Sequence, residues 1–142
     1  MLDKTDWIDL IPHAADMCLV DTVLSWDERV IHGQSTNHTS PTHPLRGSGG
    51  LHAVHLAEYG AQATAVHGAL RARAAGEGAA RPGMLVSLRG VELTVEYVDA
   101  LTGPLDIHAE CLYADTSGAQ YTFRIEHAGV LLASGRAAVI HP

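Results

Sequence analysis

Glu58 is the residue of this chain whose position is hardest to explain by folding alone. It stands among alanines in a helix-like segment, and a carboxylate on the apolar face of a helix is costly to bury unless its charge or proton is used. His38 and His43 lie shortly before it in the sequence. An imidazole titrates near neutral pH, and a carboxyl group in apolar surroundings keeps its proton more readily than in water. Together these groups could take a proton from one substrate atom and deliver one to another.

A metal site is the other chemistry that these residue types could support. His52 and His55 are three positions apart, so both imidazoles would lie on one face of a helix and could chelate an ion. The pattern is not His-Glu-x-x-His, however, and spacing fixes no third ligand. We therefore expect no bound metal and no cofactor. His67, further along the same helix, is interpreted as a core or interface histidine.

The composition indicates one globular domain, residues 1–142. Hydrophobic residues make up 46% of the chain, enough for a packed core. The formal net charge of −7 argues against nucleic acid as a partner, because phosphate binding needs a basic face. No apolar run approaches the ~20 residues that cross a bilayer, and the acidic, interrupted start is unlike a signal peptide. The two distant cysteines predict no disulfide, so a cytoplasmic location is the default expectation.

One long helix is predicted from Leu51 to about Ala75. One face of it carries residues that recur at spacings of three and four: Leu51, Val54, Glu58, Ala61, Ala65, Gly68 and Ala72. Apart from Glu58 this face is small, and small residues would let the helix lie close against a sheet. Arg71, Arg73 and Gly76 supply the cationic last turn and the stop typical of a helix C-terminus.

The rest of the chain is predicted to form strands, turns and one long loop. A short helix or turn is expected over 6–13 and a loop over 37–50, which contains two prolines. Alternating or β-branched segments predict strands within 17–26, 29–36, 84–100, 106–113, 121–126 and 130–140. Two strands, one helix and then further strands favour an α+β fold, in which a central helix is wrapped by a curved antiparallel sheet of about five or six strands.

Two segments resemble the hotdog-fold 3-hydroxyacyl-ACP dehydratases. The segment LIPHAADMCLVDTVLSWDE, residues 10–28, is similar to the family's opening Pro-His, apolar strand and Asp-x-Val-Leu. LAEYGAQ, residues 56–62, matches the Glu-x-x-Ala-Gln pattern of the central hotdog helix. More narrowly, HTSPTHPLRGSGGLHAVHLAEYGAQATAVHGAL, residues 38–70, resembles the divergent branch associated with aryl-polyene pigment synthesis.

The resemblance implies a dimer, homomeric or with another hotdog subunit, that binds an acyl thioester at the subunit interface. Glu58 corresponds to the catalytic acid, and His38 is preferred over His43 as the base. The remaining residues of the implied substrate-binding set are His13, His43, Ala53 and Gln62. Gln62 is expected to hydrogen-bond Glu58 or a backbone group, and His13 to fix the N-terminal loop. The Ala53 N–H lies where the family holds the thioester carbonyl, and a helix start around Gly50–Val54 would offer unpaired N–H groups for it.

The implied reaction is dehydration of a 3-hydroxyacyl chain to the trans-2-enoyl thioester, in fatty-acid-like or aryl-polyene synthesis. The implied partner is an acyl carrier protein that holds the chain on 4'-phosphopantetheine. Such carriers are acidic, as is this chain, so a local basic patch formed by Arg46, Arg71, Arg73 and Arg81 would have to attract them. The family's Gly-His-Phe-Pro loop is absent. Two alternatives therefore stay open: a hotdog thioesterase, and a non-catalytic subunit that supports an active partner.

Overall fold

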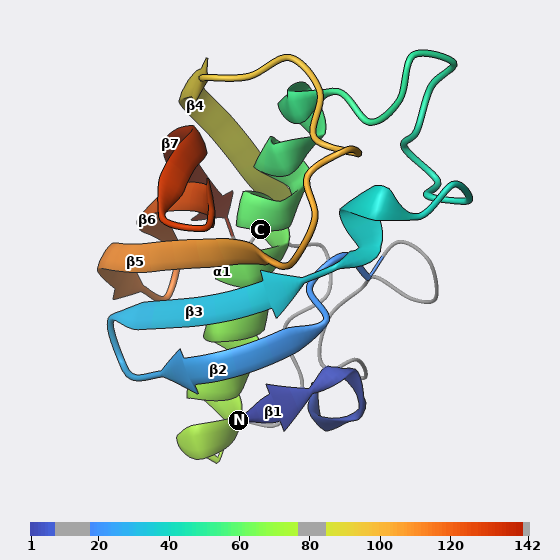
Figure 1. Cartoon of the computed structure of the whole chain (residues 1–142). Coiled ribbons are helices and arrows are strands. Elements are labelled where there is room, and N and C mark those ends of the chain that lie inside the picture. The colour runs from blue at the N-terminus through green and yellow to red at the C-terminus, as the bar shows by residue number, and fades with distance from the viewer. Residues whose placement is uncertain (8–17, 77–84, 141–142) are drawn as a thin grey trace.

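The computed structural model describes residues 1–7, 18–76 and 85–140 (Figure 1). One sheet contains seven strands in the order β1-β2-β3-β5-β6-β7-β4, with every neighbouring pair antiparallel. The strands are β1 (Leu2–Asp3), β2 (Thr22–Trp26), β3 (Val30–Ser35), β4 (Leu85–Leu93), β5 (Leu105–Asp115), β6 (Gly118–His127) and β7 (Val130–Ile140). The helix α1 spans Leu56–Ala74. The predicted hotdog fold is confirmed, with one strand more than the upper expectation because the two-residue β1 joins the edge.

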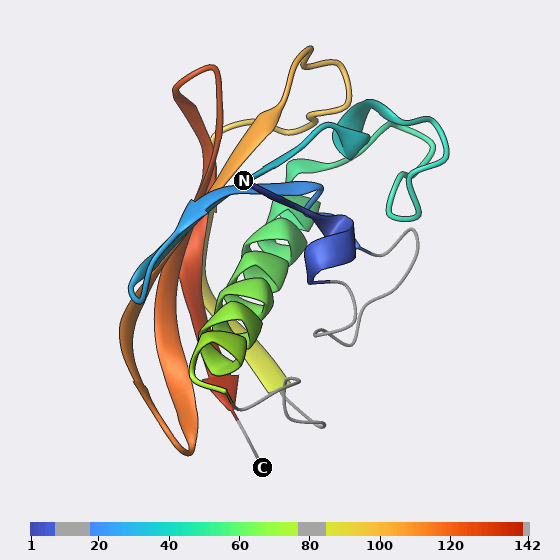
Figure 2. The ribbon, with the colours of Figure 1, turned by 90° about the horizontal axis from the view of Figure 1, so that it is seen from below.

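Helix α1 lies along the concave side of the curved sheet, as Figure 2 shows. It packs mainly on β5, β6 and β7. Gly60 lets the two layers approach closely, because a methyl group there would overlap the ring of Phe123 on β6. Phe123 is the only phenylalanine of the chain and is 3% exposed. The helix thus covers the apolar inner surface of the sheet, and burial of that surface is the main stabilising contribution.

The expected orientation of α1 is wrong. Val54, Glu58 and Gly68 on the small face are exposed, and Ala61 and Ala72 are half-buried. The larger side chains of the helix are buried instead, among them Tyr59, Val66 and Leu70, each at most 1% exposed. Large apolar side chains lose more water-accessible area there than alanines would, which decides the rotation of the helix. Val54, Glu58, Ala61, Gly68 and Ala72 form what we call the outward face of α1, whereas Leu51 and Ala65 of the predicted face are buried.

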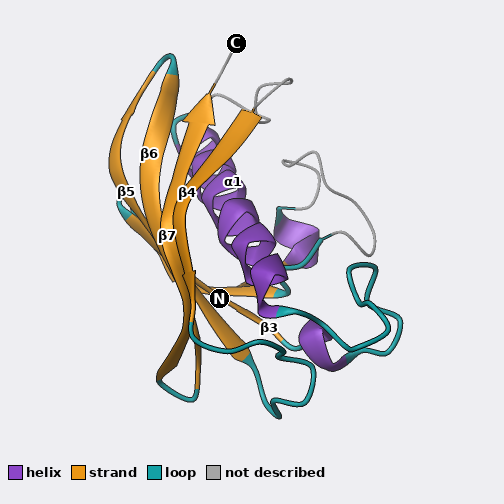
Figure 3. Ribbon diagram, turned by 90° about the horizontal axis from the view of Figure 1, so that it is seen from above, coloured by secondary structure: helices purple, strands orange, loops and turns teal. Residues whose placement is uncertain are grey.

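Two predicted boundaries also move. The α-helix begins at Leu56 rather than Leu51, because a 3-10 turn (Ala53–His55) and a β-bridge between His52 and Tyr97 precede it. The strand predicted over 17–26 begins at Thr22, and the helix or turn expected over 6–13 lies largely outside the described residues. In the described part of the chain, no helix is long and apolar enough to cross a membrane. Figure 3 shows the long loops gathered at the end of α1 where the helix begins.

Candidate functional site

His38 lies in the 3-10 turn Asn37–Thr39, and its side chain is completely buried. Its Nε2 lies 2.7 Å from the carbonyl oxygen of Leu101. A carbonyl oxygen only accepts, so Nε2 carries the hydrogen and Nδ1 of the neutral ring holds a lone pair. That Nδ1 has no hydrogen-bond partner among the described residues. Burial lowers the pKa of His38, which favours the neutral ring. The candidate base is therefore a buried imidazole with an unused acceptor.

His43 is also buried, but both of its ring nitrogens are engaged. Nδ1 accepts a hydrogen bond from the backbone N–H of Leu45 at 3.0 Å, so Nε2 carries the hydrogen in the neutral ring. Nε2 lies 2.9 Å from the hydroxyl oxygen of Tyr59 and donates to it. Burial is the main cause that lowers the pKa of His43. With no free lone pair in this arrangement, His43 is a poorer candidate for the base than His38.

Glu58 lies in the first turn of α1, and its side chain is exposed. Among the described residues it has no hydrogen-bond or ion-pair partner. The expectation that it sits on a buried apolar face is therefore wrong for the single chain, because the helix turns that face away from the sheet. The structure does not bring Glu58 into contact with His38. Glu58 is exposed, whereas His38 is completely buried.

Gln62 is 2% exposed and braces a loop against α1. Its Oε1 accepts the backbone N–H of Leu19 at 2.7 Å. This matches the expected hydrogen bond to a backbone group and keeps the segment before β2 next to the helix. His13 lies outside the described residues.

The N–H groups at the start of the helix are already bound. Ala53 N–H donates to the carbonyl of Glu96 at 2.7 Å, and Val54 N–H donates to Nδ1 of His52 at 3.0 Å. Gly50 N–H donates to Gly47 at 3.2 Å. The expectation of unpaired donors over 50–54 is therefore wrong: the segment after β4 crosses the helix start, and His52 caps it. A thioester carbonyl could use Ala53 N–H only by displacing the Glu96 carbonyl.

The other histidines of the helix do not build a metal centre. Within the described residues, no group of three or more His, Cys, Asp or Glu side chains is arranged to hold an ion. His67 is completely buried and joins three elements. Its Nε2 donates to the Asp27 carbonyl at 2.7 Å, and its Nδ1 lies 2.6 Å from the Tyr121 hydroxyl. His67 is therefore a core histidine with both nitrogens satisfied.

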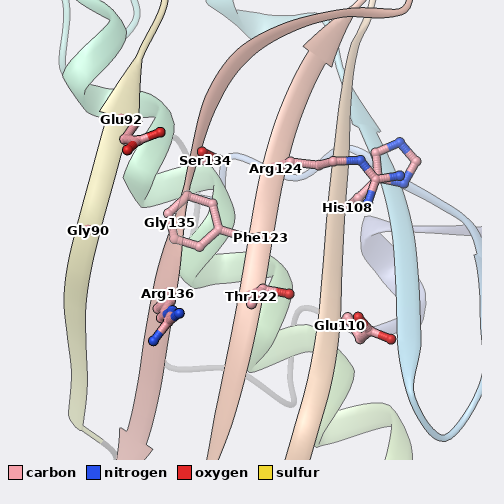
Figure 4. Close-up of a pocket in the computed structure, with 10 residues that line it drawn as sticks. All are labelled: Gly90, Glu92, His108, Glu110, Thr122, Phe123, Arg124, Ser134, Gly135 and Arg136. Atoms are coloured by element: carbon pink, nitrogen blue, oxygen red, sulfur yellow. The ribbon is translucent and has the colours of Figure 1, made fainter.

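A hollow of about 390 Å³ lies on the opposite face of the sheet. Figure 4 shows it in front of the strands, with α1 behind them. Polar side chains from four strands surround it, including Glu92, His108, Arg124 and Arg136. None of the residues predicted to take part in chemistry lines this hollow, so the candidate site is on the helix side of the sheet.

Two residues of the site were missed in the sequence. Asn37 and Tyr59 stand immediately before His38 and immediately after Glu58, and a hydrogen bond of 2.5 Å joins their side chains. Tyr59 belongs to the LAEYGAQ motif, and Asn37 opens the loop that precedes it. A buried tyrosine usually finds a partner for its hydroxyl, and this was the available signal.

The single long helix on the concave side of an antiparallel sheet defines a hotdog-fold protein, and several solved structures share this fold. The dehydratase heterocomplex ApeI:P from Xenorhabdus doucetiae aligns with a TM-score of 0.80 and 24% identity, over 95% of this chain and 90% of that one. A variant of the thioesterase SAV0944 from Staphylococcus aureus aligns with a TM-score of 0.60 and 12% identity, over 84% and 90%. The PaaI protein of the Escherichia coli phenylacetic acid degradation operon gives 0.58 and 13%, over 84% and 82%.

Comparison of the sequence with protein-family models identifies one family within the hotdog-fold class. The family model ApeP-like, described as ApeP dehydratase, matches residues 5–142. The chain therefore belongs to the ApeP-like dehydratase family. No curated protein matches the chain in sequence.

Proposed function

We propose that this dehydratase removes water from a 3-hydroxyacyl chain held as a thioester, with His38 as the base and Glu58 as the acid. The observation that supports this most directly is the state of His38. Its Nε2–H is bound to the Leu101 carbonyl, so the buried Nδ1 can accept a proton. When Nδ1 is protonated, the Leu101 carbonyl still faces an N–H and stabilises the charged ring, as the orienting partner of a general base should.

The proposed step balances two proton transfers. His38 Nδ1 takes a proton from C2 of the acyl chain, and the electron pair of that C–H bond forms the C2–C3 double bond. The C3–O bond breaks, and the leaving hydroxyl takes the proton of the Glu58 carboxyl group and departs as water. The enzyme is left with a charged His38 and an ionised Glu58. Return of one proton through solvent, from the imidazolium to the carboxylate, restores the starting state.

A second subunit would complete this site. Glu58 faces outward, and the outward face of α1 is small enough for close contact with another chain. Next to it, β4 pairs only with β7, so its other edge is free in the described structure. Leu88 and Val91 on β4 are 38% and 36% exposed. An unpaired strand with exposed apolar side chains favours pairing with another chain. We propose a second hotdog subunit, identical or different, whose addition buries Glu58.

The proposed donor of the acyl chain is an acyl carrier protein. Of the four arginines proposed to attract it, Arg46 lies close to the site, 3.4 Å from Asp99. Arg73 donates to the Asp6 carbonyl at 2.7 Å, and Arg81 lies outside the described residues. Arg46 is the arginine that belongs to the loop carrying His43, so we expect a carrier to approach from this end of α1. Aryl-polyene or fatty-acid-like synthesis is the proposed setting.

The test is dehydration of a 3-hydroxyacyl thioester by the purified chain, alone and with a hotdog dehydratase partner. Formation of the conjugated enoyl thioester is followed by ultraviolet absorbance, and released thiol is titrated in parallel. We expect enoyl product without free thiol. Glu58→Gln should lower kcat by about 100-fold or more, since a positioned acid or base contributes roughly 10²–10⁴, and His38→Asn should do the same.

Glu28→Gln is the matched control, because Glu28 is an exposed carboxylate in the turn between β2 and β3. It should keep the wild-type rate. Wild-type activity in Glu58→Gln would remove the proposed acid. Release of thiol without enoyl product would establish the thioesterase alternative, and activity that needs the partner's residues but neither His38 nor Glu58 would make this chain the supporting subunit.

A further inference from the structure

The candidate acid and base belong to two segments joined by a short chain of hydrogen bonds. His43 Nε2–H donates to the Tyr59 hydroxyl at 2.9 Å, and the Tyr59 hydroxyl donates to Oδ1 of Asn37 at 2.5 Å. Nδ2 of Asn37 donates to the Leu19 carbonyl at 2.8 Å. Tyr59 is completely buried, and burial raises its pKa, so the hydroxyl keeps its proton for this donation.

The direction of each hydrogen bond follows from the groups at the two ends of the network, which can only donate or only accept. The Leu45 N–H occupies Nδ1 of His43, which places the ring hydrogen on Nε2. The hydroxyl of Tyr59 therefore accepts from His43 and has its own hydrogen left for Asn37. Among the described residues, Tyr59 is the donor found at Oδ1 of Asn37, so each polar side chain of this network has a partner. A fully satisfied buried network holds its members in one geometry.

We infer that Tyr59 is a positioning residue whose hydroxyl holds the turn that carries His38 at a set distance from the helix that carries Glu58. Tyr59 follows Glu58 directly, and Asn37 directly precedes His38. The hydrogen bond between Tyr59 and Asn37 thus joins the two catalytic segments one residue away from each catalytic group. His43 acts through Tyr59 and supplies the second contact that orients the hydroxyl. This inference rests on the proposed function for its catalytic consequence, but not for its structural one.

The loop could otherwise move independently of the helix. Pro41 and Pro44 lie in the stretch between the turn and the helix start, where the described structure has turns and no long element. Proton transfer requires the reacting groups to be correctly placed, and an error of about 1 Å can cost about 100-fold in rate. Loss of the Tyr59 hydroxyl should therefore affect catalysis more than substrate binding, because the hydroxyl is completely buried, donates its single hydrogen to Asn37 and accepts from His43.

The experiment compares Tyr59→Phe, Asn37→Ala and the double variant with Tyr113→Phe. Tyr113 lies on β5 and is 58% exposed. Its substitution by phenylalanine removes the same hydroxyl oxygen at a position where we expect no effect on catalysis. We expect kcat for dehydration to fall about 10- to 100-fold in Tyr59→Phe with little change in KM. Because Tyr59 and Asn37 act as one unit, the double variant should lose about as much as either single variant. Tyr113→Phe should retain the wild-type kcat.

Nitrogen-15 NMR of the histidine rings gives a readout that does not need activity. In the wild type, His43 should be the Nε2–H tautomer, and in Tyr59→Phe its Nε2 signal and the His38 signals should shift or broaden. A Tyr59→Phe variant with the wild-type kcat, or with unchanged His38 signals, would overturn the inference. If the wild type dehydrates no substrate, the proposed function fails while the NMR comparison still decides whether Tyr59 orders the turn.

Discussion

Mild acidification should destabilise this protein well above the pH at which carboxylates titrate. His38, His43 and His67 are all buried, with exposed fractions of 0%, 7% and 0%. Burial is the main cause that lowers the pKa of each below its ordinary value. In the unfolded chain these histidines bind protons near pH 6.5, whereas in the folded chain they remain neutral to a lower pH. The unfolded state therefore binds more protons in this window, and stability falls as the pH falls.

The magnitude follows from linkage. A histidine that titrates at pH 6.5 when unfolded, and stays neutral when folded, contributes about 1 kcal/mol of lost stability between pH 6.5 and 5.5. Three such residues give at most about 3 kcal/mol, a large part of the ~5–15 kcal/mol that holds a typical domain folded. The loss begins near pH 6.5 and ends at the folded-state pKa values. The lowered pKa of Asp106 acts in the same direction, but only near and below pH 4.

Urea unfolding followed by circular dichroism measures this directly, at fixed protein concentration and at pH 7.5, 6.5 and 5.5. The variant His67→Gln removes one of the three groups, while its amide can still donate to the Asp27 carbonyl. Its loss between pH 6.5 and 5.5 should be smaller than that of the wild type by up to about 1 kcal/mol. A free energy of unfolding that stays constant over this interval, or increases on acidification, would refute the reasoning.

Three glycine substitutions should have effects that depend on the space and the backbone conformation at each position. Gly60→Ala should lower the free energy of unfolding by about 1–3 kcal/mol, because the new methyl group overlaps the Phe123 ring. Gly68→Ala should raise the free energy of unfolding by up to about 1 kcal/mol, because the new methyl group would have no heavy atom within 4 Å. Equal urea midpoints for these two variants would contradict this packing. Gly50→Ala should cost about 1–3 kcal/mol, since its φ of 114° is unfavourable for alanine and the methyl group would overlap the Asp99 carboxylate. A wild-type thermal midpoint in Gly50→Ala would show that this turn can change conformation freely.

Much of the fold can be predicted from the sequence because its boundaries are set locally. Helix α1 ends at Ala74, where Arg71, Arg73 and Gly76 predict its end, and Gly76 adopts a φ of 79°. The alternation over 130–140 predicts β7 with the boundaries that the structure has. Turn residues between such segments indicate where one strand ends and the next begins. The helix-end, alternation and turn signals depend on residues that are neighbours in the sequence, so one amino-acid sequence is sufficient to detect them.

The rotation of α1 could not be predicted in the same way. Its first four turns carry one carboxylate, Glu58, and otherwise mostly apolar or small residues on every side. A weakly amphipathic helix does not reveal which side is buried. The choice depends on the shape of the sheet, where Phe123 fits against Gly60 and leaves Glu58 and Gly68 exposed on the other side of the helix. Glu58 was therefore found from its motif, but its exposure in the single chain was not.

The state of the site depends on contacts between distant parts of the chain. Leu101 determines which nitrogen of His38 carries hydrogen, although 63 residues separate the two. The Glu96 carbonyl occupies the Ala53 N–H that the family resemblance would assign to the substrate. Neither of these two hydrogen bonds can be deduced from the spacing of residues within the motif. The sequence thus identifies His38 as the candidate base, whereas the structure is needed to assign its tautomer and its free lone pair.

The two edges of the sheet differ in a way that limits assembly. One edge is the long strand β4, and the other is the two-residue β1, which covers only the beginning of β2 before a bulge between Val23 and Ser25. A strand added to β4 in an antiparallel pair consumes the only long edge in the described structure. Neither partner then offers a comparable edge to a third chain, so sheet extension stops at two subunits. A pairing at β4 would therefore close on itself and, among the described strands, would leave no long edge from which an open-ended filament could grow.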